Sequence, residues 1–160
     1  MTDTTSEPYK QDIDTHLKLL LQYRHIAIVG LSANQQRPSH AVGTYMQAEG
    51  YDIIPVNPRY AGETILGKRV YASLTEAREA GKLIEIVDIF RKAEYTLPIV
   101  DETAKIGAKV VWLQLGIKSA DAEKKAFEKG LVFVQDKCIK IEHARFFGGL
   151  HTVGLNAGLS

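Results

Sequence analysis

HIAIVGLSANQQRPSHAVGTYMQAEG, residues 25–50, carries the pattern that decides the fold of this chain. It opens with Ile26–Val29, a continuous apolar run closed by Gly30, which is typical of a strand buried on both faces of a parallel sheet. Pro38 then stands where the first turn of a helix tolerates proline, and apolar residues at helical spacing follow as far as Gly50. The segment therefore predicts a strand, a loop and a helix, in the order that α/β proteins use.

The same alternation continues along the chain. We predict further strands over 51–56, 84–90, 110–115 and 131–135, and further helices over 10–24, 73–81, 92–106, 119–129 and 138–146. Pro98 is expected to mark a helix boundary or a kink, and 65–67 a short connection. Strands and helices in alternation imply right-handed crossovers, so we expect an α/β fold of Rossmann type: a doubly wound, mainly parallel five-stranded sheet with helices on both faces.

The length of 160 residues suits a single domain. We expect a flexible N-terminus over 1–9, one domain over 10–147 and a glycine-rich C-terminal tail over 148–160. No apolar run approaches the ~20 residues of a membrane helix, and the first residues lack the pattern of a secretory signal. We therefore expect a cytoplasmic protein.

The charge balance gives no reason to expect nucleic acid or a membrane surface as a partner, because 20 basic and 19 acidic side chains leave a net charge of +1. The single cysteine, Cys138, excludes an intramolecular disulfide and is expected to begin the last helix as a small apolar residue. The five histidines show no metal-binding spacing, so no metal is expected. Asp88 and Asp136 are interpreted as capping or loop-bracing carboxylates, which leaves no catalytic constellation.

The loop of residues 30–39 is the first candidate binding segment. In doubly wound sheets, ligands bind beyond the carboxyl ends of the strands, and the free N–H groups at a helix start stabilise a phosphate. Ser32, Arg37 and Ser39 could add side-chain donors. Neither GxGxxG nor a Walker loop is present, so a plain connection stays open as the alternative.

The segment of residues 56–59, Val-Asn-Pro-Arg, is the second candidate and bears on the type of nucleotide. An NAD-binding domain places a carboxylate after the second strand, whereas this chain has Arg59. A cation there suits the phosphorylated ribose of coenzyme A or of NADP. The alternative is a polar turn with a solvated arginine.

Two further strand ends complete the set of candidates. Phe90 could line a channel and Arg91 could reach a pyrophosphate, although a core phenylalanine beside a helix-start arginine fits equally well. Gln114 and Gly116 follow the fourth strand, where the glycine can instead serve only to free the chain for the next helix.

In combination, seven segments of this chain resemble the small CoA-binding protein family, single-domain relatives of the amino-terminal domain of the succinyl-CoA synthetase α subunit. They are IAIVGLS, RPS, IIPVNPR, ILGKRVYASL, VDIFR, VVWLQLGI and DKCIKIEHARF, and the tail FFGGLHTVGLNAG resembles an extension found in part of that family. The resemblance implies CoA along the strand ends, with 30–39 near the phosphates, 56–59 near adenosine, and Phe90 and Arg91 near pantetheine. The synthetase domain that carries a phosphorylated histidine has no counterpart, so the resemblance implies binding and not ligase activity.

We therefore predict a protein that is not an enzyme and that binds coenzyme A or an acyl-CoA as a sensor, carrier or regulatory module. The alternatives are an NADP-dependent oxidoreductase and a nucleotide-regulated interaction protein, and a protein partner or a homo-oligomer stays open. The predicted cofactor-binding residues are Gly30, Leu31, Ser32, Arg37, Ser39, Val56, Asn57, Pro58, Arg59, Phe90, Arg91, Gln114 and Gly116.

Overall fold

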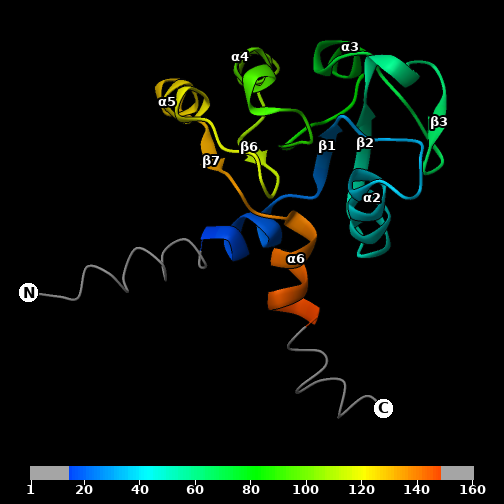
Figure 1. Ribbon diagram of the computed structural model, residues 1–160. Coiled ribbons are helices and arrows are strands. Elements are labelled where there is room, and N and C mark those ends of the chain that lie inside the picture. Colours follow the sequence, from blue (N-terminus) through cyan, green and yellow to red (C-terminus); the bar gives the residue numbers. More distant parts are fainter. Residues whose placement is uncertain (1–14, 149–160) are drawn as a thin grey trace, which may run out of the picture.

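A parallel sheet of five strands forms the centre of the computed structural model (Figure 1). The model describes residues 15–148, so the predicted N-terminus over 1–9 and the tail beyond Gly148 lie outside the described residues. The strands are β1 (His25–Val29), β2 (Asp52–Val56), β5 (Ile86–Ile89), β6 (Val110–Leu113) and β7 (Val132–Val134), in the order β2-β1-β5-β6-β7. Every neighbouring pair is parallel, which confirms the predicted fold class.

The central strands are shorter than the sequence predicts. β5 ends before Phe90 and β6 ends before Gln114, whereas the apolar runs suggested strands over 84–90 and 110–115. Both strands end at the same level of the sheet, so the side chains that follow them can line a crevice at its carboxyl edge.

Helices cover both faces of the sheet, as predicted (Figure 1). On one face lie a helical segment over 15–22, α2 (Pro38–Ala48) and α6 (Ile139–His143), and on the other lie α3 (Leu74–Glu79), α4 (Thr96–Lys105) and α5 (Ala120–Glu128). Ser73 and Ser119 accept hydrogen bonds from Glu76 N and Ala122 N, and these bonds cap the N-termini of α3 and α5. Within residues 15–148, no helix has the length and apolar character that crossing a membrane requires.

Two local predictions need correction, and a third is narrowed to one of its alternatives. Residues 65–67 do not merely connect, because β3 (Thr64–Ile65) and β4 (Lys68–Arg69) form a small hairpin whose two turn residues have φ of 55° and 73°. Pro98 marks a helix boundary, as one of its two alternatives predicted, since α4 begins at Thr96 and leaves the proline in the first turn, where an N–H is not needed. The last predicted helix is the short α6 followed by a π-helical turn over Ala144–Gly148.

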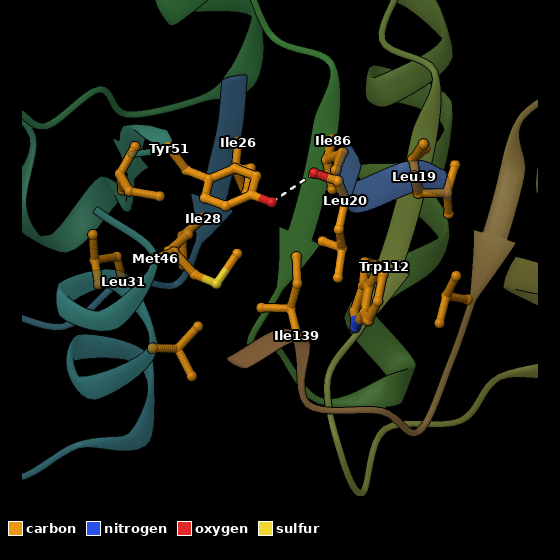
Figure 2. Packing of buried hydrophobic residues seen from close by; sticks show 14 of the residues in the cluster. Leu19, Leu20, Ile26, Ile28, Leu31, Met46, Tyr51, Ile86, Trp112 and Ile139 are labelled. Carbon is orange, nitrogen blue, oxygen red and sulfur yellow. Dashed lines mark hydrogen bonds between the residues drawn. The ribbon is translucent and has the colours of Figure 1, made fainter. Parts of the chain in front are cut away.

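The core beneath α2 and α6 joins segments that are far apart in the sequence (Figure 2). Ile139 of α6 and Trp112 of β6 pack in the same cluster as Leu20, whose carbonyl accepts the hydroxyl of Tyr51 at 2.6 Å. Glu142 adds a buried polar contact, with its Oε1 2.7 Å from His16 Nδ1. These contacts hold α6 against the sheet and against the N-terminal helical segment.

Candidate functional site

The crevice of this sheet lies between β1 and β5. From β1 the chain crosses to β2 at one edge, and from β5 it proceeds to β6 and β7 at the other, so ligands are expected at the carboxyl ends of these two strands. Gly30, the residue after β1, has φ of 92°, and a Cβ there would lie 2.7 Å from the carbonyl oxygen of Phe90. Only glycine allows the two strand ends to approach this closely.

One side of the crevice opens into a hollow of about 370 Å³, which we name the polar pocket. Arg37 and Arg59 are its charged side chains, and no carboxylate lines it. Its lining consists of Gly30, Ser32, Asn34, Arg37, Pro38, Ser39, Asn57, Arg59, Tyr60 and Phe90. This composition favours an anion over a cation.

The loop over 31–37 holds its shape through its own side chains. Ser39 Oγ accepts from Ser32 N at 3.0 Å, and Ser32 Oγ in turn accepts from Asn34 N at 3.0 Å. Asn34 Oδ1 accepts from Gln36 N at 2.9 Å. The sequence suggested these serines as ligand donors, whereas here their oxygens also brace the loop that leads to α2.

The start of α2 leaves a backbone donor at the polar pocket, because the N–H of the lining residue Ser39 has no hydrogen-bond partner among the described residues. Pro38 occupies the first helical turn, and the preceding residue, Arg37, makes no side-chain capping bond. The positive end of the helix dipole therefore lies beside the Arg37 side chain, and this arrangement stabilises a phosphate.

Asn57 fixes the other wall of the polar pocket. Its Nδ2 donates to Leu31 O at 3.0 Å, and its Oδ1 accepts from Arg59 N at 3.0 Å. The guanidinium of Arg59 lies 5.5 Å from the ring centroid of Tyr60. An exposed cation and an aromatic face thus stand together at the end of β2.

Beyond Phe90 lies a second hollow of about 600 Å³, which we name the apolar chamber. Pro38 and Phe90 line both hollows, so the two adjoin. The lining of the chamber consists of Pro38, Val42, Phe90, Arg91, Lys92, Ala93, Gln114, Leu115, Gly116, Ile117, Cys138 and Ile141.

Gly30, Phe90 and Gln114 stand side by side at the level where β1, β5 and β6 end. Phe90 N donates to Val29 O at 2.9 Å, and Gln114 N donates to Ile89 O at 3.3 Å, so the ladder continues one step past the strands. The side chain of Gln114 is 4% exposed, and its Oε1 accepts from Ile139 N at 3.0 Å. This bond ties the end of β6 to the start of α6.

Asp88 corrects the sequence interpretation. It lies in β5 between Ile28 and Trp112 of the neighbouring strands, is 0% exposed, and neither carboxylate oxygen has a hydrogen-bond partner among the described residues. Because it lacks these hydrogen bonds, Asp88 neither caps a helix nor braces a loop. Burial raises the pKa of this carboxyl well above its ordinary value. Asp136 does brace a loop, as predicted, because its Oδ1 accepts from Gly116 N at 2.8 Å.

The structure gathers ten of the predicted site residues around the two hollows. Gly30, Ser32, Arg37, Ser39, Asn57, Arg59 and Phe90 line the polar pocket, and Phe90, Arg91, Gln114 and Gly116 line the apolar chamber. The side chains of Leu31 and Val56 are buried in the core, and Leu31, Val56 and Pro58 line neither hollow.

Sequence reasoning missed several lining residues. Tyr60 could have been found, since an aromatic side chain follows Arg59 directly. Cys138 does begin the last helix, as its N-cap residue, but its place in the chamber was not predicted. No local signal points to it or to Ile141, because α6 reaches the chamber only through the packing of the folded chain. The other missed residues are Asn34, Pro38, Val42, Lys92, Ala93, Leu115 and Ile117.

Comparisons with known proteins agree with this geometry. The protein YneT of Bacillus subtilis (strain 168) is 38% identical over 127 residues, which cover 79% of this chain and 90% of YneT. A hypothetical protein from Pyrococcus horikoshii OT3 superposes with a TM-score of 0.78 at 38% identity, over 83% of this chain and 90% of that one. The structure of cell-free ID.343 from Thermus thermophilus gives 0.76 at 34% identity, over 84% and 98%.

A family model described as a CoA binding domain matches residues 24–144, which include both hollows. This match spans most of the chain and agrees with the resemblance inferred from its motifs. The chain therefore belongs to the CoA binding domain family.

Proposed function

We propose that this protein binds coenzyme A or an acyl-CoA without transforming it, as a cytoplasmic sensor, carrier or regulatory module. The observation that carries the proposal is the pairing of a carboxylate-free polar pocket with an apolar chamber across Phe90. CoA has the same division, because a highly charged phosphorylated nucleotide continues into an uncharged arm.

The polar pocket suits the nucleotide end of CoA. The start of α2 and the side chain of Arg37 offer donors for the pyrophosphate. Arg59 is the candidate for the ribose 3′-phosphate, since a guanidinium meets phosphate oxygens with two parallel hydrogen bonds. Tyr60 offers an aromatic face for adenine beside it.

The apolar chamber suits the pantetheine arm and what is attached to it. Its volume of about 600 Å³ falls within the range of small-molecule sites, and most of its lining is apolar. Because Pro38 and Phe90 border both hollows, an arm that leaves the polar pocket enters the chamber directly.

The absence of a reaction is proposed from the lining of the two hollows. Among the described residues, neither hollow is lined by a carboxylate or a histidine, so a general base beside a nucleophile is missing. Cys138 supplies a thiol to the chamber but has no histidine or carboxylate beside it in that lining.

Isothermal titration of the ligand-stripped full chain with CoA, and of a fresh sample with NADPH, tests the proposal. NADPH is the competing ligand because Arg59 could also meet its 2′-phosphate. We expect micromolar binding of CoA and at least tenfold weaker binding of NADPH. Tighter binding of NADPH than of CoA would contradict the proposal and favour an oxidoreductase.

A further inference from the structure

The side-chain amide of Gln114 has a fixed orientation. A backbone N–H can only donate, so the hydrogen bond from Ile139 N identifies the accepting atom as the oxygen of the carboxamide. The Nε2 group must therefore occupy the opposite side of the amide. Gln114 is 4% exposed, its backbone N–H donates to Ile89 O at the end of β5, and its side chain accepts from Ile139 N of α6, so this orientation is rigid.

The Nε2 group of Gln114 has no hydrogen-bond partner within residues 15–148. In that part of the chain, the only fully enclosed side-chain atoms without a partner are the two oxygens of Asp88, so Nε2 is accessible to some extent. Gln114 lines the apolar chamber, which gives this donor its access. A nearly buried amide with two unused N–H groups favours a ligand that brings an acceptor oxygen to this point.

The side chains that line the chamber around this donor favour an aliphatic group on the ligand. Val42, Leu115, Ile117 and Ile141 line the chamber, and two of them are exposed, Leu115 to 62% and Ile141 to 48%. Large apolar side chains left open around a hollow are typical of a site that an apolar ligand covers. Pantetheine alone does not cover these walls with apolar surface, because it carries two amides and a hydroxyl, so an aliphatic group attached to it accounts for them better.

The cations of the chamber do not change this conclusion. The guanidinium of Arg91 lies 5.1 Å from the ring centroid of Tyr95, and its Cδ lies within 3.3 Å of the place where a Cβ of Gly30 would be. Arg91 lines the chamber but reaches Gly30 at the edge of the polar pocket, so it is available to the phosphates of the ligand. Lys92, the other cation in the lining of the chamber, is exposed to solvent.

We propose that the ligand is an acyl-CoA with an uncharged aliphatic acyl group, and that Gln114 Nε2 donates a hydrogen bond to its thioester carbonyl oxygen. This inference rests on the proposed function, since it requires the nucleotide in the polar pocket and the arm in the chamber. It adds the class of acyl group and makes Gln114 the residue that recognises a thioester.

Ligand pairs test the inference on the unaltered protein. Titrations would use CoA, hexanoyl-CoA, succinyl-CoA and S-hexyl-CoA, a thioether that keeps the chain and lacks the carbonyl. We expect hexanoyl-CoA to bind about tenfold or more tightly than CoA, because several methylene groups are buried. We expect hexanoyl-CoA to bind about threefold to tenfold more tightly than S-hexyl-CoA, the effect of one hydrogen bond. We also expect it to bind more tightly than succinyl-CoA.

Gln114→Glu tests the residue. The variant keeps an oxygen for Ile139 N but loses the N–H donors, so hexanoyl-CoA and S-hexyl-CoA should bind it equally. Gln135→Glu is the matched control, because Gln135 Oε1 accepts from Ser119 N at 3.0 Å in the same way and lies outside the chamber. It should keep the full difference between the two ligands.

The outcomes distinguish failure of CoA binding from failure of the proposed acyl group or of the role of Gln114. Failure of CoA and of every acyl-CoA to bind would overturn the proposed function itself. Binding of CoA with no gain for hexanoyl-CoA, or a stronger gain for succinyl-CoA, would overturn the aliphatic class alone. Equal binding of hexanoyl-CoA and S-hexyl-CoA by the unaltered protein would remove Gln114 from thioester recognition, even where Gln114→Glu does not fold.

Discussion

The polar pocket and the apolar chamber share Pro38 and Phe90 but are built in different ways. Apart from Phe90, the polar pocket comes from two stretches, 30–39 and 57–60, and its loop is held by hydrogen bonds between near neighbours. The chamber needs four separate stretches, the last of which is α6. The difference teaches that the polar pocket is formed by local structure, whereas the apolar chamber is formed by tertiary packing.

The largest expected effect comes from Gly30→Ala, at the boundary of the two hollows. The new Cβ would lie 2.7 Å from Phe90 O and the residue would keep a positive φ, so we expect a loss of about 3 kcal/mol or more in the free energy of unfolding. Urea denaturation measures this loss.

Gly50→Ala is the matched control for that variant. Gly50 has a similar φ of 95°, but its Cβ would meet nothing within 4 Å. We expect a loss of about 1–2 kcal/mol from the backbone conformation alone. Equal losses at the two glycines would show that the close approach of the strand ends is unimportant.

Arg59→Ala should separate the polar pocket from the chamber in ligand binding. We expect the variant to weaken CoA by about 1.5–3 kcal/mol more than 3′-dephospho-CoA, because a charge-assisted contact to the 3′-phosphate is lost. Titration of both ligands measures the difference, with Arg78→Ala on α3 as a control outside both hollows. The same loss for both ligands would place the 3′-phosphate elsewhere.

Asp88→Asn should show that the buried carboxyl of Asp88 lowers the free energy of unfolding as pH rises. A buried acid whose pKa is raised holds its proton in the folded state and releases it on unfolding, so the stability of the unaltered protein falls as pH rises above the ordinary value of 3.8. We expect the variant to gain about 1 kcal/mol or more at pH 8 relative to its gain at pH 5.

Urea denaturation at the two pH values measures the effect of Asp88→Asn. Asp101→Asn, on the half-exposed outer side of α4, controls for the change of residue type. A gain from Asp88→Asn that is the same at pH 5 and pH 8 would show that the carboxyl is ionised in the folded protein throughout.

Leu115→Ala has the smallest expected effect on the protein itself. Leu115 is 62% exposed, so the free energy of unfolding should change by no more than about 0.5 kcal/mol. Binding of hexanoyl-CoA should nevertheless weaken by about 1 kcal/mol, because the acyl chain loses a wall. Leu83 is 53% exposed and lies outside the chamber, so Leu83→Ala should leave the binding of hexanoyl-CoA unchanged. An equal loss of affinity in both variants would show that the acyl group does not contact Leu115.

Much of the fold and of the polar pocket could be predicted from the sequence. The mostly apolar runs at Ile26–Val29 and Ile86–Ile89 predict strands, because a strand inside a parallel sheet is buried on both faces. Arg37 and Arg59 could be identified because each lies in the segment that follows a strand, and the ends of parallel strands meet at one edge. Asp88 could not be interpreted, because its lack of a partner depends on which neighbouring strands lie beside it.

The amino-acid order thus established the alternation of strands and helices and the chemistry of the loops that follow each strand, because these depend on near neighbours. Only the tertiary structure decided that α6 returns to the carboxyl edge, that Ile139 N orients the amide of Gln114, and that Cys138 and Ile141 face Phe90 across one chamber. Those contacts join residues separated by 25 to 51 positions, and no local periodicity indicates which distant segments pack together.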